Sequence, residues 1–251
     1  MILQQLAPDY ALAQQVKADD PSIVTARVTV PSPEGHGSIN GLLTRPAKAK
    51  GKLPAVLVVH ENRGLNPYIE DVARRLAKAG YLALAPDGLT SVGGYPGNDD
   101  KGRELQAKLN PAKLLEDFFA SFEFLRDHKD STGKVGAVGF CYGGGVCNAL
   151  AVAYPDLGAS VPYYGRQPKP EEVAAIKAPL LIQYAEADER INAGWLPYQA
   201  ALISNQKRYE VHFYPGTQHG FHNDSTPRYD KAAAELSWAR TLAFFKANLG
   251  G

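Results

Sequence analysis

The stretch KVGAVGFCYGGGVCNALAVA, residues 134–153, decides the fold of this chain. Its first part, 134–140, is an apolar run that predicts a buried strand, and the residues from Gly143 onward have the spacing of a helix. Between the two, residues 139–143 (GFCYG) match the pattern of a nucleophile elbow, with cysteine where serine is usual. Small neighbours are needed on so sharp a turn, because a bulky Cβ would collide with the exposed side chain.

Strands and helices alternate on both sides of this stretch. Short apolar runs predict strands at 54–60, 81–85, 158–163, 180–184 and 209–214. Apolar residues at helical spacing predict helices at 67–79, near 100–109, and at 111–127, 194–205 and 228–248. Two β-rich segments precede them and predict an antiparallel pair, 22–30 and 38–45. We therefore expect an α/β fold with a mostly parallel central sheet, helices on both faces, and chemistry in the loops at the carboxyl ends of the strands.

Composition excludes several classes of protein. The chain has 251 residues, 45% hydrophobic and 21% charged, which is typical of a globular protein, and we expect a single domain at 21–251 after an N-terminal extension at 1–20. The 27 Lys and Arg residues balance 26 Asp and Glu residues, so no basic field favours nucleic acid. No apolar run reaches the roughly 18 residues of a membrane span, so no membrane partner is expected. Two cysteines are too few for a disulfide scaffold and lack zinc-ligand spacing.

The N-terminal extension leaves localisation open. Residues 11–13 (ALA) have the small-x-small shape of a signal-peptidase site, but no charged segment and no apolar segment of adequate length precede them. A short N-terminal helix is the favoured interpretation, and the remnant of an export signal is the alternative. The chain is expected in the cytoplasm as written, and in the periplasm if a signal has been removed.

The two cysteines have different expected roles. Cys141 stands at a predicted helix N-terminus, where unpaired N–H groups and the positive end of the helix dipole favour a thiolate. We therefore expect Cys141 to be reactive, although an inert buried thiol is the ordinary fate of a free cysteine. Cys147 lies inside the predicted helix, where a small packing residue is expected.

A nucleophile of this kind needs an acid and a histidine that follow it in that order along the chain. Asp188 comes just after a predicted strand, with Glu186 and Glu189 as local rivals. His219 follows another predicted strand and a Pro-Gly turn, and His222 is the runner-up. The remaining histidines considered are expected to be solvated or packed in the core: His36, His128 and His212.

At this point the sequence resembles the dienelactone hydrolases of the α/β-hydrolase superfamily, from about residue 38 onward. The resemblance rests on the segments 60–66 (HENRGLN), 85–87 (APD), 139–144 (GFCYGG), 163–165 (YYG) and 219–221 (HGF), and on Asp188. It implies the α/β-hydrolase fold and a triad of Cys141, His219 and Asp188. It also implies that Glu61 is a fourth member that contacts the thiol in the resting enzyme. A solvated surface glutamate is the alternative for Glu61.

The same resemblance implies an oxyanion hole formed by the backbone N–H groups of Tyr142 and Asn62. It implies no cofactor and no metal. The expected reaction is hydrolysis of an ester or lactone through a covalent thioester, and the expected partner is a small-molecule substrate. The oligomeric state is expected to be a monomer or a small homo-oligomer.

One departure from the family pattern concerns the substrate. Dienelactone hydrolases hold the carboxylate of their lactone with two arginines, and those places here are Ser91 and Asn223. Without these guanidinium groups a neutral ester or lactone fits better, unless Arg166 or Arg190 approaches from another loop. Three residues are predicted to line the pocket: Tyr164, Arg166 and Trp195.

Three alternatives remain beside this interpretation. The same thiolate and oxyanion hole could act on phosphate triesters or carbamates. The chain could instead be a ligand-binding module that keeps the fold without turnover, because a fold does not establish an activity. A thiol metal site is the least favoured, because the two cysteines and His219 lack a recognisable ligand spacing.

Overall fold

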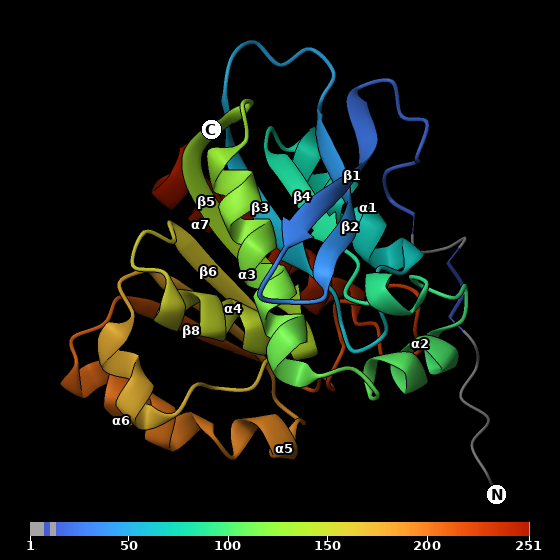
Figure 1. The fold of residues 1–251 in the computed structure, drawn as a ribbon. Coiled ribbons are helices and arrows are strands. Elements are labelled where there is room, and N and C mark those ends of the chain that lie inside the picture. Colours follow the sequence, from blue (N-terminus) through green and yellow to red (C-terminus); the bar gives the residue numbers. More distant parts are fainter. Residues whose placement is uncertain (1–7, 11–13, 251) are drawn as a thin grey trace, which may run out of the picture.

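An eight-stranded sheet organises the residues that the computed structural model describes, 8–10 and 14–250 (Figure 1). Its strands lie in the order β1-β2-β4-β3-β5-β6-β7-β8. The strands β1 and β2 pair antiparallel with each other and β2 pairs antiparallel with β4, whereas every neighbour from β4 to β8 is parallel. The predicted mostly parallel sheet with antiparallel first strands is confirmed. The strands are β1 (Ile23–Ser32), β2 (Gly37–Pro46), β3 (Leu53–Val59), β4 (Leu82–Pro86), β5 (Ser131–Phe140), β6 (Ala159–Tyr163), β7 (Leu180–Ala185) and β8 (Tyr209–Tyr214).

Helices cover both faces of the sheet, as the alternation predicts (Figure 1). They are α1 (Pro67–Lys78), α2 (Asp99–Gln106), α3 (Pro111–Asp127), α4 (Tyr142–Ala153), α5 (Glu189–Asn192), α6 (Trp195–Ser204) and α7 (Lys231–Leu249), with 3₁₀ turns η1 (Thr90–Val92) and η2 (Pro170–Ala175). The helices α1 and α7 pack on one face, and α3, α4 and α6 pack on the other. Two of these helices begin with the same device, an asparagine cap followed by proline, at Asn66 and Asn110.

The central strands explain why the sequence pattern is so clear. Strand β3 lies between β4 and β5, and its side chains from Pro54 to Val59 are buried on both faces. A parallel strand covered on both faces has no solvent side, so it is written as a continuous apolar run and not as an alternation. Edge strand β8 is half-exposed and alternates more. The loops after β3, β5, β7 and β8 all leave the sheet at its carboxyl edge, which is where the predicted catalytic residues lie.

The N-terminal extension is described only in part. The signal-like residues 11–13 lie outside the described residues, and 14–20 form bends and turns where a helix was one expectation. This segment is fastened to the body by buried hydrogen bonds, because the backbone N–H groups of Gln15 and Val16 donate to Asp71 on α1 over 3.1 and 2.8 Å. A domain boundary at residue 21 remains a prediction. Among the described helices, none combines the length and apolar character needed to cross a bilayer.

Candidate active site

The elbow at Cys141 has the strained backbone that its sequence predicts. Cys141 ends the turn from β5 into α4 with φ 56° and ψ −111°, a conformation that few side chains adopt. The neighbouring glycines are required by contact: a Cβ on Gly139 would lie 2.1 Å from the Gly143 carbonyl oxygen, and one on Gly143 would lie 2.2 Å from the Val59 carbonyl oxygen. The turn therefore holds a half-buried Cys141 side chain at the carboxyl edge of the sheet.

Asp188 and His219 form a pair at the same edge. Nδ1 of His219 lies 2.5 Å from Oδ2 of Asp188, and their loops are also joined by a backbone hydrogen bond from Ala187 to Thr217 of 2.9 Å. Burial by itself would lower the pKa of His219, but the hydrogen bond to Asp188 and the interaction with the Cys141 side chain outweigh it and raise the pKa to about 9. With Nδ1 used by Asp188, Nε2 is the nitrogen left for Cys141; it is buried and has no well-aligned hydrogen-bond partner among the described residues.

The structure does not bring the rival residues into this arrangement. His222 is buried and its Nδ1 is 2.7 Å from the Tyr68 hydroxyl, and burial lowers its pKa well below the ordinary value. An imidazole held neutral in this way serves packing. Glu186 is exposed and accepts a hydrogen bond from the Gly216 backbone over 2.8 Å. Glu189 is exposed on α5.

Glu61 is buried and does not lie on the surface. Its side chain is 4% exposed, and its Oε2 accepts a hydrogen bond of 3.0 Å from Nδ2 of Asn223. Among the described residues no hydrogen bond joins Glu61 to Cys141. Tyr164 interacts electrostatically with both Glu61 and Cys141. Burial raises the pKa of Tyr164 well above the usual value, and the charges of Glu61 and Cys141 raise it further.

Tyr164 lies next to His219. Its backbone has φ 37°, its ring centroid is 4.9 Å from that of His219, and its side chain is fully buried. Its hydroxyl has no hydrogen-bond partner among the described residues. A buried hydroxyl without a partner is a ready hydrogen-bond donor for a ligand atom that enters the site.

The loop after β3 is held by two residues for which no role is predicted from the sequence, His60 and Asp87. Nδ1 of His60 lies 2.5 Å from the Glu61 carbonyl oxygen, and its Nε2 accepts from the Gly88 backbone over 3.0 Å. Full burial lowers the pKa of His60, so the ring is neutral and carries its proton on Nδ1. Asp87 accepts from the backbone of Leu65 over 3.1 Å. These contacts fix the loop that presents Glu61, and they explain why the HENRGLN and APD segments occur together.

A cavity of about 490 Å³ opens beside Cys141 and is lined by residues of α3 and α4. Of the residues predicted to line the pocket, Arg166 lies on its wall. Tyr164 does not reach the cavity. Trp195 does not either: it is the first residue of α6 and packs in the core, with its ring 5.7 Å from Tyr184. Within the ranges that the structure describes, no group of three or more His, Cys, Asp or Glu is placed to hold a metal ion.

Comparison with known proteins gives the family. A model of the dienelactone hydrolase family matches residues 39–249. The chain belongs to the dienelactone hydrolase family. It is 72% identical over 106 residues to "Putative hydrolase fragment YghX" of Escherichia coli strain K12, an alignment that covers 42% of this chain and 91% of that protein. It is 33% identical over 230 residues to "Putative carboxymethylenebutenolidase" of Saccharolobus solfataricus, with 76% and 88% covered.

A solved structure agrees with this assignment. The solved structure named "Putative Dienelactone Hydrolase from Klebsiella pneumoniae" superimposes on this chain with a TM-score of 0.78 at 29% identity. The match covers 89% of this chain and 98% of that one. The α/β-hydrolase fold expected from the sequence is thereby confirmed. Together with the family match, these relatives support assignment of the chain as a hydrolase of lactones or esters.

Two arginines lie near this dienelactone hydrolase site at positions that the sequence did not single out. Arg63 follows Glu61 in the loop after β3 and donates to Asp99 of α2 over 2.9 Å. Burial opposes its charge, but Glu61 and Asp99 outweigh burial and raise the pKa of Arg63. Arg228 lies beside Gly220, where a Cβ would be 3.4 Å from the guanidinium, and it also interacts with Tyr164. At the two positions where the family has carboxylate-binding arginines, this chain has Ser91, which is exposed in η1, and Asn223, which is buried.

Proposed function

We propose that this chain hydrolyses neutral esters or lactones with Cys141 as nucleophile, His219 as base and Asp188 as the residue that orients the base. One observation carries the proposal: His219, paired with Asp188 over 2.5 Å, keeps Nε2 for a cysteine that faces a cavity from a strained turn. A nucleophile, a base and an orienting acid from three loops at one sheet edge are what acyl transfer requires.

In the first half of the reaction, Nε2 of His219 takes the thiol proton and Sγ of Cys141 attacks the substrate carbonyl carbon. The tetrahedral oxyanion is held by the backbone N–H groups of Tyr142 and Asn62. Tyr142 is the first residue of α4, so its N–H has no acceptor within the helix and is free to donate. The intermediate then collapses: the carbon–oxygen bond to the alcohol breaks, the alcohol takes the proton from His219, and a thioester remains on Cys141.

In the second half, His219 takes a proton from water as the water oxygen attacks the thioester carbon. The carbon–sulfur bond breaks, the acid product leaves, and Cys141 receives the proton back from His219. Asp188 favours the positively charged imidazole in both halves, consistent with the raised pKa of His219. In a lactone the alcohol stays attached to the acyl group. Nothing therefore leaves after the first half, and one hydroxy acid is released at the end of the second.

Glu61 is proposed to hold the thiol in the resting enzyme. Its burial, and its fixation by Asn223, keep the carboxylate inside the site on the side of Tyr164. The contact with the thiol is proposed to form in solution, since catalytic hydrogen bonds are often long or poorly aligned in a site without substrate.

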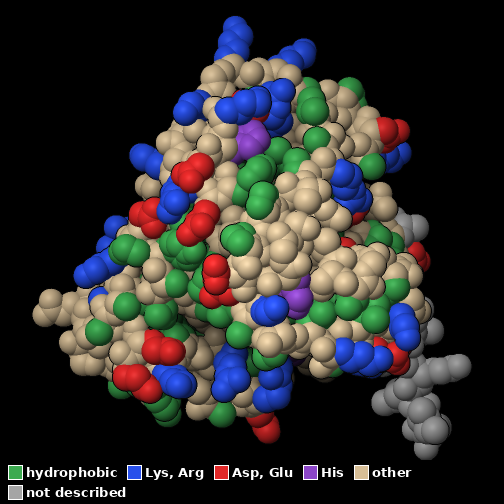
Figure 2. Space-filling view, in the orientation of Figure 1, with side chains coloured by type: hydrophobic (Ala, Val, Ile, Leu, Met, Phe, Trp, Pro, Cys, Tyr) green, Lys and Arg blue, Asp and Glu red, His purple; other side chains and the backbone are tan. Residues whose placement is uncertain are grey.

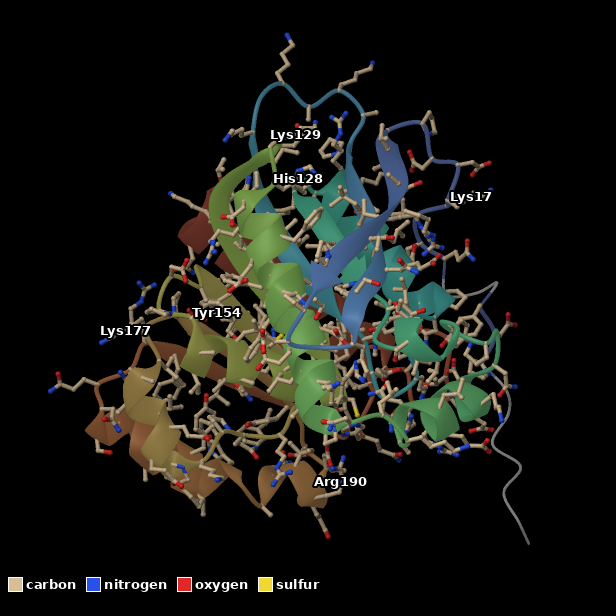
Figure 3. The ribbon with its side chains drawn as sticks, in the orientation of Figure 1. Lys17, His128, Lys129, Tyr154, Lys177 and Arg190 are labelled. Carbon is tan, nitrogen blue, oxygen red and sulfur yellow. The ribbon has the colours of Figure 1, made fainter. Side chains whose placement is uncertain are left out.

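The arginines other than Arg228 favour a neutral substrate. Arg63 is committed to Asp99, Asn223 replaces one family arginine, and Ser91 replaces the other. Arg166 lines the cavity but is exposed, so water weakens its hold on a carboxylate. Arg190 lies on α5 at the outside of the molecule (Figure 3).

The test compares a lactone carrying a free carboxylate with its methyl ester of the same ring. We expect kcat/KM at least about tenfold higher for the neutral compound, since tenfold corresponds to about 1.4 kcal/mol of lost carboxylate recognition. The matched variant is Arg228→Ala. A preference for the carboxylate that disappears in Arg228→Ala would contradict the neutral assignment and make Arg228 the carboxylate-binding residue.

A further inference from the structure

The cavity beside Cys141 is an apolar groove that runs along α4. One face of α4 forms its floor, with Val146, Ala149 and Val152 at helical spacing. Leu115 and Phe119 of α3, one turn apart, form a wall. Hydrophobic side chains gather over these two helices in the space-filling view (Figure 2). Leu115, Phe119, Ala149 and Val152 are all half-buried, so the groove offers apolar surface that the protein itself leaves uncovered.

The opposite wall is the segment after β6, held in place by polar contacts. Asn148 of α4 donates to the Arg166 carbonyl oxygen over 2.8 Å, and Gln167 donates to the Tyr184 hydroxyl over 2.8 Å. Both walls are therefore anchored to the core. A groove with fixed walls and a volume of about 490 Å³ is within the usual range for small-molecule sites.

Gly145 keeps the first turn of the groove open. Most glycines of the elbow are forced by contact, but a Cβ on Gly145 would meet its nearest neighbour, Arg166, at 3.7 Å, an ordinary contact. Packing therefore does not require glycine there. A side chain would instead stand over the groove one turn from Cys141, between the nucleophile and the rest of the floor.

The lining of the groove extends along α4 as far as Ala153. Tyr154, directly after α4, packs its ring against Phe119 at 5.3 Å and donates to Glu123 of α3 over 3.0 Å (Figure 3). The floor from Tyr142 to Ala153 is about 16 Å long, at 1.5 Å per residue. An extended chain of eight carbons, at about 1.2 Å per bond, spans about 9 Å and fits within this length.

We infer that this groove binds the acyl group of the substrate, and that the preferred substrates are neutral esters or lactones whose acyl part carries an unbranched apolar chain of about six carbons or more. The inference rests on the proposed function, because it assumes that the carbonyl carbon sits at Sγ of Cys141. The chain would then extend from the nucleophile along α4 toward Tyr154, and the alcohol would leave on the side of His219.

The experiment measures kcat/KM for p-nitrophenyl acetate, butyrate, hexanoate and octanoate, which share one leaving group. Wild type should gain about two- to fourfold per added methylene up to the length of the groove, as expected for burial of each methylene in an apolar site. Ala149→Phe places a ring across the floor and should lower the octanoate-to-acetate ratio at least about tenfold. Ala232→Phe, the same substitution at an exposed position of α7 on the other face of the sheet, should keep the wild-type ratio.

The outcomes separate the two proposals. Turnover that requires Cys141 but has the same kcat/KM for all four esters, or an octanoate-to-acetate ratio unchanged by Ala149→Phe, overturns the acyl groove and leaves the proposed function standing. Absence of Cys141-dependent turnover for every ester overturns the proposed function and the groove with it. A second readout does not depend on turnover: alkylation of Cys141 by N-octyl iodoacetamide should be faster than by iodoacetamide in wild type, and this advantage should be lost in Ala149→Phe.

Discussion

Asn223 donates a hydrogen bond of 3.0 Å to Oε2 of Glu61 and so joins the loop after β8 to the loop after β3. Both side chains are buried. The other end of the Asn223 amide is also used, because its Oδ1 accepts from the backbone N–H and the hydroxyl of Ser225. An amide is the group that satisfies all of these partners, since it offers a donor to the acid and an acceptor to the serine.

Replacing Asn223 by aspartate tests the role of Glu61. Asn223→Asp keeps the shape and the acceptor toward Ser225, but it places two carboxyl groups about 3 Å apart, so one of them holds a proton at neutral pH. If ionised Glu61 supports the thiol, kcat/KM should fall by about tenfold or more and its acidic limb should move to higher pH. The pH–rate profile checks this. The neutral variant Asn223→Ala should lose activity without that movement, and equal profiles for both variants would contradict the role given to Glu61.

Asp188→Asn tests whether Asp188 controls the pKa of His219. Asp188 contributes to the raised pKa of His219, so the histidine titration followed by NMR should move down from about 9 toward the ordinary value. Activity should fall by about 10²–10⁴-fold, because the imidazole loses both orientation and charge stabilisation. An unchanged histidine titration in the variant would show that the 2.5 Å contact does not control His219.

The same pair predicts a pH dependence of stability. The pKa of His219 is raised in the folded protein above its unfolded value of about 6.5, so the pairing stabilises the fold fully below about pH 6.5 and this contribution is lost as pH rises through about 9. Wild type should therefore exceed Asp188→Asn by about 1–3 kcal/mol in free energy of unfolding at pH 6. Urea unfolding at pH 6 and pH 10 measures it, and a difference that grows with pH would have the wrong sign.

Gly139 at the end of β5 and Gly145 in the first turn of α4 should respond to alanine in opposite directions. Gly139→Ala forces a Cβ to within 2.1 Å of the Gly143 carbonyl oxygen, and it should reduce the free energy of unfolding by about 1–3 kcal/mol or more. Gly145→Ala meets only ordinary contacts inside α4, and it should increase the free energy of unfolding by about 0.5–1 kcal/mol. Thermal unfolding of both variants checks the pair. Equal destabilisation of both variants would mean that the space around Gly145 is too small for a methyl group, contrary to the 3.7 Å contact.

Much of the fold could be predicted because its signals are local. Strand β3 is buried on both faces and reads as an unbroken apolar run, and the elbow at Cys141 is marked by glycines that the close contacts require. Asp188 and His219 follow β7 and β8, which are adjacent parallel strands. Their positions after these strands in the sequence were therefore enough to predict that they lie close together.

The pocket could not be predicted in the same way. Trp195 follows a strand and a loop, as pocket residues often do, but it begins α6 and its ring belongs to the core face of that helix. The groove between α3 and α4 depends on how far apart the two helices pack on the sheet, and no local sequence pattern records that distance. Arg63 and Asp99 are likewise paired only by the fold.

The covalent intermediate is the central claim, and mass spectrometry tests it most directly. The protein is incubated with p-nitrophenyl acetate and quenched in acid, with wild type, Cys141→Ser, Cys141→Ala, Cys147→Ala and His219→Ala compared. We expect an acetyl group mapped to Cys141 that accumulates in His219→Ala, full turnover in Cys147→Ala, and no adduct on sulfur in Cys141→Ser. Turnover of the ester at the wild-type rate in Cys141→Ala, which has no nucleophile at this position, or an acetyl group that maps to another residue, would contradict the account.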